Sequence, residues 1–404
     1  MKSGLSFLVA ARQSEIGELE QLAKTSELVN VIGRLIHALQ RERGISNIFL
    51  GTHGSRFGDQ RRQQIAECDE VEQRVREHFD ALDTDAYRAY NGSRLFSRIA
   101  FVLHGLDALP GLRQRISTMA LPPEESTAAF VRLIAGLLAV VFEAADSATD
   151  PEISRALVAL FNFMQGKEFA GQERAFGAFV FASGHADAAQ QQQWLHLIAS
   201  QEGCFDVFTD FSDAEVLASW RASESGETMA ELERMRRIGT TLNARGAFDT
   251  DLSQKWYDCC TRRIDAMKMV EDLLAAHLRM LSERKIAQAR AELRDQQAIL
   301  DALSREAGAA SPGDPAQYGR HLERSVLGMV QEQSRRLQSM SDELETVRAA
   351  LNERKVVERA KGLLMATRKL SEEEAFKMLR QTAMNQNRKL VEVAESVLAM
   401  AEYL

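Results

Sequence analysis

The sequence predicts an all-α protein that consists of helical bundles, a coiled-coil segment and a small helical tail. Apolar residues recur at helical spacing over most of residues 12–280, a seven-residue apolar repeat follows from Ile286, and only 6 prolines interrupt the 404 residues. Hydrophobic residues make up 45% of the chain and charged residues 27%, which is typical of a globular protein with a core. This composition excludes a collagenous, disulfide-rich or wholly disordered chain.

Residues 12–280 are expected to form successive amphipathic helices. Two stretches that follow one helical face are Ile32, Leu35, Ile36 and Leu39, and Leu133, Ile134, Leu137, Leu138 and Val141. Prolines at positions 110, 122, 123 and 151 predict joints between helices, and residues 51–58 and 223–226 predict loops. Seven or eight helices of this kind pack most simply as bundles.

Residues 281–350 are predicted to be a coiled-coil linker. Ile286, Leu293 and Leu300 recur every seven residues, and Val330, Leu337, Leu344 and Leu351 do so again after a break at residues 308–319. Charged residues fill most of the gaps, which is typical of a coiled coil. We expect this segment to join two copies in a homodimer, the alternative being a helix that folds onto its own chain.

The cysteines and the N-terminus favour a cytoplasmic protein. Cys68, Cys204, Cys259 and Cys260 fit no zinc-site spacing, and reduced, buried thiols are the simplest interpretation. The apolar run near Met1 is too short for a signal peptide, and no stretch of about 18 apolar residues predicts a membrane span. We expect no metal, no cofactor and no membrane partner.

Charge is divided unevenly along the chain. The whole chain has a net charge of −8, which excludes a protein held to nucleic acid by bulk positive charge. Residues 351–404 nevertheless contain 10 basic and 8 acidic residues, whereas the rest of the chain contains 40 basic and 50 acidic residues. A basic tail on an acidic body favours a polyanionic partner for the tail.

The tail itself is predicted to form three short helices, over about residues 351–367, from Ser371, and from about Asn387. Ser371 and Glu374 have the spacing of a capping box, in which each side chain satisfies a backbone amide of the other residue. Three helices in 54 residues provide only a thin core.

The tail resembles the ANTAR module, the RNA-binding output domain of bacterial transcription antiterminators. The resemblance rests on Arg354–Met365, on Ser371 with Glu374-Ala375-Phe376, on Leu379-Arg380, and on Ala383, Asn387, Leu390 and Val393-Ala394. It implies that residues 351–404 bind a hairpin in a leader mRNA. The cations that we expect to meet its phosphates are Lys361, Lys369, Arg380, Arg388 and Lys389.

The tail has only two aromatic residues, Phe376 and Tyr403. A sheet that stacks bases on aromatic side chains is therefore excluded, and recognition through the shape and phosphates of the hairpin is favoured. The alternative is that these cations belong to an ordinary solvated helix face.

Several arginines lie on or beside apolar helix faces in the first 280 residues. Arg43 follows Leu39 by four residues and Ile36 by seven, so it lies on the buried stripe of its helix. The segment Gln40–Gly44 is echoed by Gly171–Ala175, which predicts equivalent helices in two related bundles. A buried guanidinium needs an anion, which is either an internal carboxylate such as Glu42 or Glu173, or a bound ion.

The segment Leu35–Gly44 with Ser46 resembles the start of the NIT domain, a helical nitrate- and nitrite-sensing domain. The stretch from Trp256 to Asp272 resembles the closing helices of the NIT domain. The resemblance implies a sensor over residues 1–280, made of two four-helix bundles with the anion held between them by arginines. Arg43 and Arg236 are the expected pair, and Arg174 and Arg237 are further candidates.

Guanidinium suits nitrate because it donates hydrogen bonds in a plane, and nitrate is planar with three acceptor oxygens. Ser46 and Thr240 are possible neutral donors. No phosphate-binding glycine loop and no Ser/His/Asp or Cys/His set indicates an enzyme, so no catalytic residue is predicted.

The two resemblances together imply a cytoplasmic regulator of transcription antitermination. Nitrate or nitrite binding to the sensor is expected to release the tail, which then binds the leader RNA and prevents formation of a terminator. The alternative is an anion sensor that signals through protein contacts of its coiled coil without binding RNA.

Overall fold

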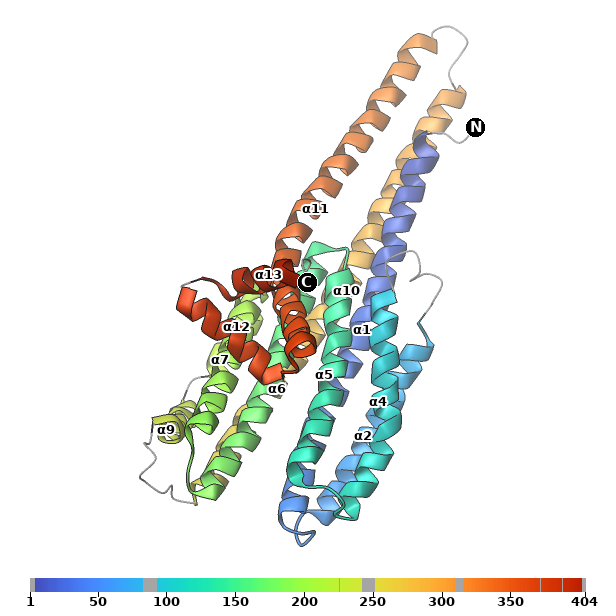
Figure 1. Cartoon of the computed structure of the whole chain (residues 1–404). Coiled ribbons are helices and arrows are strands. Elements are labelled where there is room, and N and C mark those ends of the chain that lie inside the picture. Colours follow the sequence, from blue (N-terminus) through green and yellow to red (C-terminus); the bar gives the residue numbers. More distant parts are fainter. Residues whose placement is uncertain are drawn as a thin grey trace. The chain divides into compact units, whose positions relative to one another are not determined.

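The computed structural model describes residues 4–82, 93–224, 226–241, 251–309, 315–370, 372–386 and 388–401. All secondary structure in these ranges is helical, so the predicted all-α fold class is confirmed. The chain divides into two compact units, residues 1–333 and 334–404 (Figure 1). The helices are α1 (Gly4–Gly51), α2 (Gly58–Asp80), α4 (Ser93–Ser117), α5 (Pro123–Ser147), α6 (Pro151–Ser183), α7 (Ala188–Phe211), α8 (Ala214–Ser223), α9 (Glu227–Thr241), α10 (Leu252–Ala309), α11 (Pro315–Arg368), α12 (Glu372–Gln386) and α13 (Leu390–Ala401).

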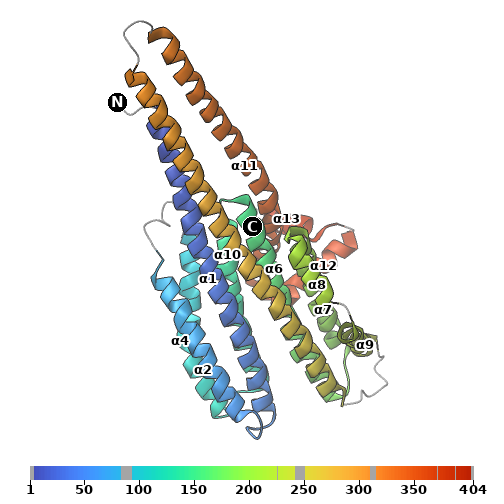
Figure 2. The ribbon, with the colours of Figure 1, turned by 180° about the vertical axis from the view of Figure 1, so that it is seen from behind.

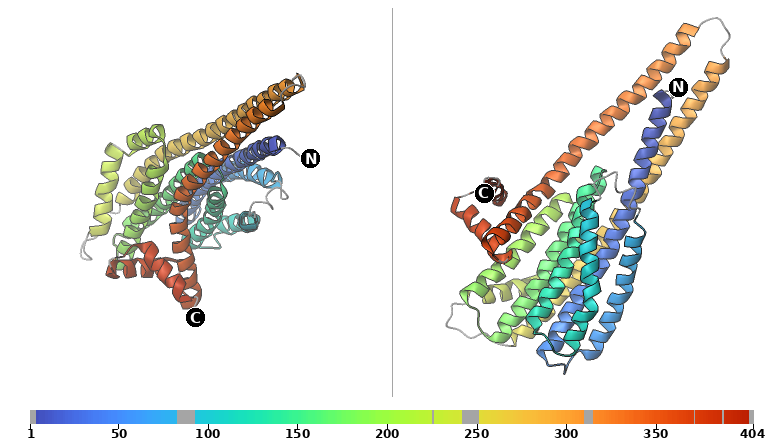
Figure 3. Two further views of the ribbon diagram at one scale, coloured as in Figure 1. Left: turned by 90° about the horizontal axis from the view of Figure 1, so that it is seen from above. Right: turned by 45° about the vertical axis from the view of Figure 1, so that its right-hand side comes forward.

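The first unit contains two groups of packed helices, which we call the first and the second bundle (Figures 1 and 3). In the first group, α1 packs against α2 and α5, and α4 packs against α5. In the second, α6 packs against α7 and α10, and α8 and α9 pack against α10. The same neighbour relations recur, with α6 in the place of α1 and α10 in the place of α5. The first group buries the two apolar faces that the sequence pattern predicts, including Leu35, Ile36, Leu137 and Val141.

Tryptophans fill the core of the second bundle. Trp194 on α7 and Trp256 on α10 are fully buried, with ring centroids 5.1 Å apart. A Cβ atom at Gly239 would lie 2.2 Å from the Trp194 ring, and one at Gly177 would lie 2.5 Å from the Trp256 ring. Glycine is therefore required at both positions for α9 and α6 to pack this closely against the indoles.

The two bundles meet along four helices, because α1 packs against α10 and α5 packs against α6. Beyond the bundles, α1 and α10 continue side by side (Figure 2). Ion pairs join Arg12 to Glu292 at 3.1 Å and Arg290 to Glu20 at 2.6 Å. Ala289, which belongs to the first seven-residue repeat, is buried. Part of this repeat therefore packs on α1 of its own chain, as the alternative to self-association predicted.

The prolines mark most of the joints that the sequence predicted. Pro123 and Pro151 lie in the first turns of α5 and α6, where a missing backbone N–H costs nothing, and Asp150 caps α6 by accepting a hydrogen bond from Ile153 N at 3.0 Å. The joint predicted at Pro110 is wrong, because this residue lies inside α4. Leu106 and Leu109 are buried just before it, so packing holds the helix together across the proline.

Two helices, α4 and α5, are long and apolar enough to cross a membrane by length and composition. Most of the apolar window of α5 and a smaller part of that of α4 are buried inside the protein. Both helices belong to the first bundle, and their apolar residues contribute to its core.

The second unit is a three-helix module. The C-terminal part of α11, with α12 and α13, encloses a core that includes Ala360, Leu364, Leu379 and Val393. The first of its helices was expected to begin at about residue 351, but α11 runs without interruption from Pro315 to Arg368. Ser371 and Asn387 lie outside the described residues, and so does the predicted capping box.

Candidate functional site

Arg43 lies in the contact between α1 and α6. Its side chain is 2% exposed, which agrees with its place on the apolar stripe. Its Nη1 donates to Oε1 of Glu168 at 2.5 Å and its Nη2 donates to Oε2 at 3.2 Å. Glu168 on α6 is equally buried, so the two residues form an ion pair between the two bundles.

The Glu168 carboxylate also accepts hydrogen bonds from two glutamines. Gln40 Nε2 on α1 donates to Oε2 at 2.8 Å, and Gln172 Nε2 on α6 donates to Oε1 at 2.9 Å. With the two contacts from Arg43, four N–H donors from two helices converge on one planar anion.

Arg174 occupies the reciprocal position on α6. A Cβ atom added to Gly44 would lie 3.1 Å from Arg174 Nη2, and one added to Gly171 would lie 2.8 Å from Arg43 Nη2. Each arginine therefore lies against a glycine of the opposite helix, because only glycine leaves room there for a guanidinium.

The guanidinium of Arg174 has neutral neighbours. Its Nη1 donates to Thr261 Oγ1 at 3.1 Å, and its Cζ lies 4.9 Å from the ring centroid of Tyr257. Arg174 is 8% exposed, and among the described residues no carboxylate lies within ion-pair distance of it. Arg43 and Arg174 thus bring two positive charges to this contact, and Glu168 supplies one negative charge.

The glutamates that precede these two arginines have an equivalent role in each bundle. Glu42 accepts from Arg113 Nε and Nη2, both at 2.8 Å, and so ties α1 to α4. Glu173 accepts from Arg236 Nε at 2.8 Å and Nη2 at 2.6 Å, and so ties α6 to α9. This correspondence agrees with the sequence echo between Gln40–Gly44 and Gly171–Ala175.

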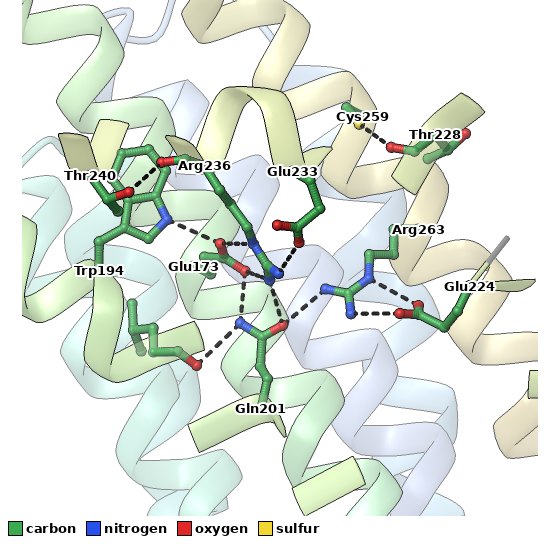
Figure 4. A network of polar contacts seen from close by, with 11 residues as sticks. Glu173, Trp194, Gln201, Glu224, Thr228, Glu233, Arg236, Thr240, Cys259 and Arg263 are labelled. Atoms are coloured by element: carbon green, nitrogen blue, oxygen red, sulfur yellow. Dashed lines mark hydrogen bonds and ion pairs between the residues drawn. The ribbon is translucent and has the colours of Figure 1, made fainter. Parts of the chain in front are cut away.

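Arg236 is therefore held within the second bundle (Figure 4). Trp194 Nε1 donates to Glu173 at 3.0 Å and Gln201 Nε2 donates to it at 2.7 Å, so the carboxylate is fully surrounded. Burial opposes ionisation of Glu173, but the charge and hydrogen bonds of Arg236 outweigh it and lower the pKa of Glu173.

The other predicted sensor residues lie apart from the contact between Arg43 and α6. Arg237 is exposed on α9. Ser46 is buried and accepts a hydrogen bond from Arg61 Nε at 3.4 Å, and Thr240 Oγ1 donates to the backbone carbonyl of Arg236 at 2.8 Å. Of the four predicted arginines, the structure brings Arg43 and Arg174 to the same contact between α1 and α6.

Sequence reasoning missed the charged residues that α6 and α10 add nearby. Lys167 is fully buried and forms an ion pair with Glu271, and Lys268 Nζ donates to Glu271 Oε1 at 3.1 Å. Burial, with the charges of Lys167 and Lys268, lowers the pKa of His37 to about 2, so this imidazole is neutral at pH 7. The available signal was the charged pair Lys167-Glu168, which follows a largely apolar stretch of α6.

The described residues contain no group of three or more His, Cys, Asp or Glu side chains arranged to hold a metal ion. The cysteines at positions 68, 204, 259 and 260 are buried free thiols, and burial raises the pKa of Cys260 well above its ordinary value.

The predicted RNA-binding cations differ in exposure. Lys369, Arg380, Arg388 and Lys389 are exposed, with Lys369 directly after α11 and Arg388 and Lys389 between α12 and α13. Lys361 is only 8% exposed, and its Nζ lies 5.9 Å from the ring centroid of Phe376. Its ammonium therefore contributes to packing between α11 and α12 as well as to the charge of the module.

Arg388 has a structural role in addition to its charge. Its Nη2 donates to the Glu392 carbonyl and to Ser396 Oγ, both at 3.1 Å, and its Nε pairs with the Glu392 carboxylate at 3.4 Å. These contacts tie the segment before α13 to the first turns of that helix.

Comparison with known proteins agrees with this two-part arrangement. The family model for nitrate and nitrite sensing, NIT, matches residues 34–279, and the ANTAR domain model matches residues 345–398. The nitrate regulatory protein of Klebsiella oxytoca is 33% identical over 398 residues, which cover 98% of this chain and 95% of that protein. A solved structure of the NasR transcription antiterminator is also similar, with a TM-score of 0.62, 32% identity and 98% coverage of both chains.

Proposed function

The chain belongs to the nitrate- and nitrite-sensing NIT family and also contains an ANTAR domain, and we propose that it is a nitrate-responsive regulator of transcription antitermination. In this proposal residues 1–280 bind the ion, residues 281–350 transmit the signal, and residues 351–404 bind a hairpin in a leader mRNA. The protein acts in the cytoplasm, without a cofactor or a catalytic step, as a homodimer that needs no membrane.

The observation that carries the proposal is the pair of reciprocal arginines between α1 and α6. Arg43 and Arg174 come from different bundles, and of the described residues only Glu168 supplies a carboxylate to neutralise them. A small anion at this contact balances the second positive charge. Nitrate and nitrite fit because their coplanar oxygens match the planar donors of guanidinium.

This proposal changes the expected partner of Arg43 from Arg236 to Arg174. Arg236 already forms a two-point ion pair with Glu173, so an ion bound there would have to displace a surrounded carboxylate. Direct contact of Arg236 or Arg237 with the ion stays a prediction from the sequence.

The switch follows from the position of this contact between two bundles. An ion held by Arg43 and Arg174 stabilises one arrangement of the bundles, and binding shifts the equilibrium toward it. In our proposal that arrangement leaves the RNA-binding face of residues 351–404 accessible. The four exposed cations then contact phosphates, which makes RNA binding dependent on salt.

The test is RNA binding by the full-length protein with and without nitrate. A leader-RNA hairpin in a gel-shift assay should be bound more tightly with nitrate or nitrite than with equal concentrations of chloride or sulfate. Equal RNA affinity in all four salts would contradict a nitrate switch. Nitrate binding with no RNA binding in any salt would favour the alternative, in which the sensor signals through protein contacts.

A further inference from the structure

The polar contact around Arg43 already contains an anion, the Glu168 carboxylate. This carboxylate receives two N–H groups of Arg43 and one amide N–H each from Gln40 and Gln172, with the four donor–acceptor distances between 2.5 and 3.2 Å. Arg43, Gln40 and Glu168 are all at most 4% exposed. The donors therefore form a built site for a planar oxyanion, and a side chain of the protein fills it.

A carboxylate and a nitrate ion present similar acceptors. Each is planar, carries one negative charge shared between equivalent oxygens, and accepts a two-point contact from a guanidinium. We propose that Glu168 is an internal nitrate mimic, which occupies the donors of Arg43 in the absence of ligand, and that nitrate binds by displacing it. This inference rests on the proposed function, since it names the residue that competes with the ion.

The neighbourhood explains why displacement is possible. Glu168 is attached to α6, and so is Arg174, which has no carboxylate partner among the described residues. When nitrate replaces Glu168 on Arg43, the ion lies beside a second guanidinium that the carboxylate leaves unpaired. Before the exchange, Arg43 contacts the Glu168 carboxylate. After it, both Arg43 and Arg174 contact the nitrate ion.

Competition of this kind sets the affinity for nitrate. Nitrate binding must supply more free energy than the Arg43–Glu168 ion pair that it replaces. The protein therefore responds only at nitrate concentrations high enough to displace Glu168. A glutamine at position 168 keeps the size of the side chain but removes its charge. It should compete poorly, and the empty positive charge should attract the ion.

The experiment is calorimetric titration of nitrate into three full-length proteins: the wild type, Glu168→Gln and Glu67→Gln. Glu67 pairs with Arg41 on the exposed side of α1, so its substitution removes the same charge away from the site. Glu168→Gln should lower the Kd for nitrate by about tenfold or more, the ordinary scale of coupling between competing ligands. Glu67→Gln should leave the Kd unchanged. Formate, a free carboxylate, should compete with nitrate in Glu168→Gln.

Each outcome is decisive. An equal or higher Kd in Glu168→Gln would overturn the inference, because Glu168 would then position Arg43 for the ion. If neither the wild type nor Glu168→Gln binds nitrate, the proposed function itself fails. If Glu168→Gln does not fold, Glu168→Asp replaces it in the test. This variant keeps the charge on a shorter side chain that cannot reach all four donors, so it should bind nitrate more tightly than the wild type. No gain in affinity would again overturn the inference.

Discussion

Replacing Arg174 with alanine should separate ligand binding from stability. The side chain makes one hydrogen bond to Thr261 and one contact with the Tyr257 ring. A hydrogen bond from a charged donor contributes about 1.5–3 kcal/mol and a cation–π contact about 0.5–2 kcal/mol. Arg174 has no carboxylate partner in the part of the chain that the structure describes, so removal of its buried charge offsets much of this loss. We therefore expect the free energy of unfolding to fall by about 2 kcal/mol or less.

Replacing Arg43 with alanine should destabilise the protein more than replacing Arg174. Arg43→Ala leaves the Glu168 carboxylate buried without its cation, which costs about 3–5 kcal/mol. Both substitutions should nevertheless abolish the response to nitrate, because each removes one of the two guanidiniums that grip the ion. Arg41→Ala is the matched control, since Arg41 lies on the same helix, is exposed, and pairs with the exposed Glu67.

The assay is urea unfolding of each full-length variant with and without nitrate. At a nitrate concentration 100 times its Kd, the wild type and Arg41→Ala should gain about 2.7 kcal/mol, whereas Arg174→Ala should gain nothing. Full stabilisation of Arg174→Ala by nitrate would refute the role of Arg174 in binding. A loss of 3–5 kcal/mol without nitrate would show that Arg174 neutralises a carboxylate, contrary to the reasoning from its contacts.

Four other substitutions test the remaining parts of the molecule. Arg236→Ala should destabilise the protein by about 3–5 kcal/mol at pH 7, because it leaves Glu173 buried and unpaired. Because the pKa of Glu173 is lowered in the folded protein, the ion pair stabilises the protein at neutral pH, and this stabilisation is lost as the pH falls below about 4. Urea unfolding near pH 3 should therefore show a smaller difference in stability between Arg236→Ala and the wild type. Arg388→Ala and Lys389→Ala should each lower the salt slope of RNA binding by about one, but only Arg388→Ala should also lower the melting temperature; unchanged slopes would place the RNA face elsewhere. Ala383→Leu should destabilise the C-terminal module by about 1–3 kcal/mol through overpacking, and a circular-dichroism melt identical to that of the wild type would contradict the close packing of α12.

The sequence predicted the helical class and the burial of Arg43 because both follow from local spacing. It also predicted that Gln40–Gly44 and Gly171–Ala175 are equivalent, and the structure explains the echo through the two glutamate–arginine ties, Glu42 to Arg113 and Glu173 to Arg236. Glu42 and Glu173 were named as possible partners of buried arginines, but which arginine meets which carboxylate could not be predicted. Helical periodicity shows that a side chain points inward, but which carboxylate it meets depends on how helices distant in sequence are packed.

Other differences between the sequence pattern and the structure have the same origin. A seven-residue repeat specifies a helix that buries one stripe, but it does not specify what covers the stripe, and α1 covers part of it between Ile286 and Leu293. Pro110 was expected to end a helix because local preference is against a proline there, but packing of the surrounding leucines overrides that preference. Lys167 and Glu168 escaped notice because they belong to no motif, although charges on an apolar helix face are themselves a signal.

The length of α10 gives the anion contact a mechanical consequence. Thr261, which touches Arg174, lies near the start of a helix that has 58 residues. At a rise of about 1.5 Å per residue, the end of α10 at Ala309 is about 70 Å away, so a tilt of about 5° at Thr261 would displace it by about 6 Å. No proline or glycine lies between Leu252 and Ala307 to absorb the motion, and α1 braces the helix through Arg12 and Glu292. The pair of α1 and α10 is therefore stiff. A small change in the tilt of α10 near Thr261 would displace the end of the helix at Ala309 by more than one helical turn.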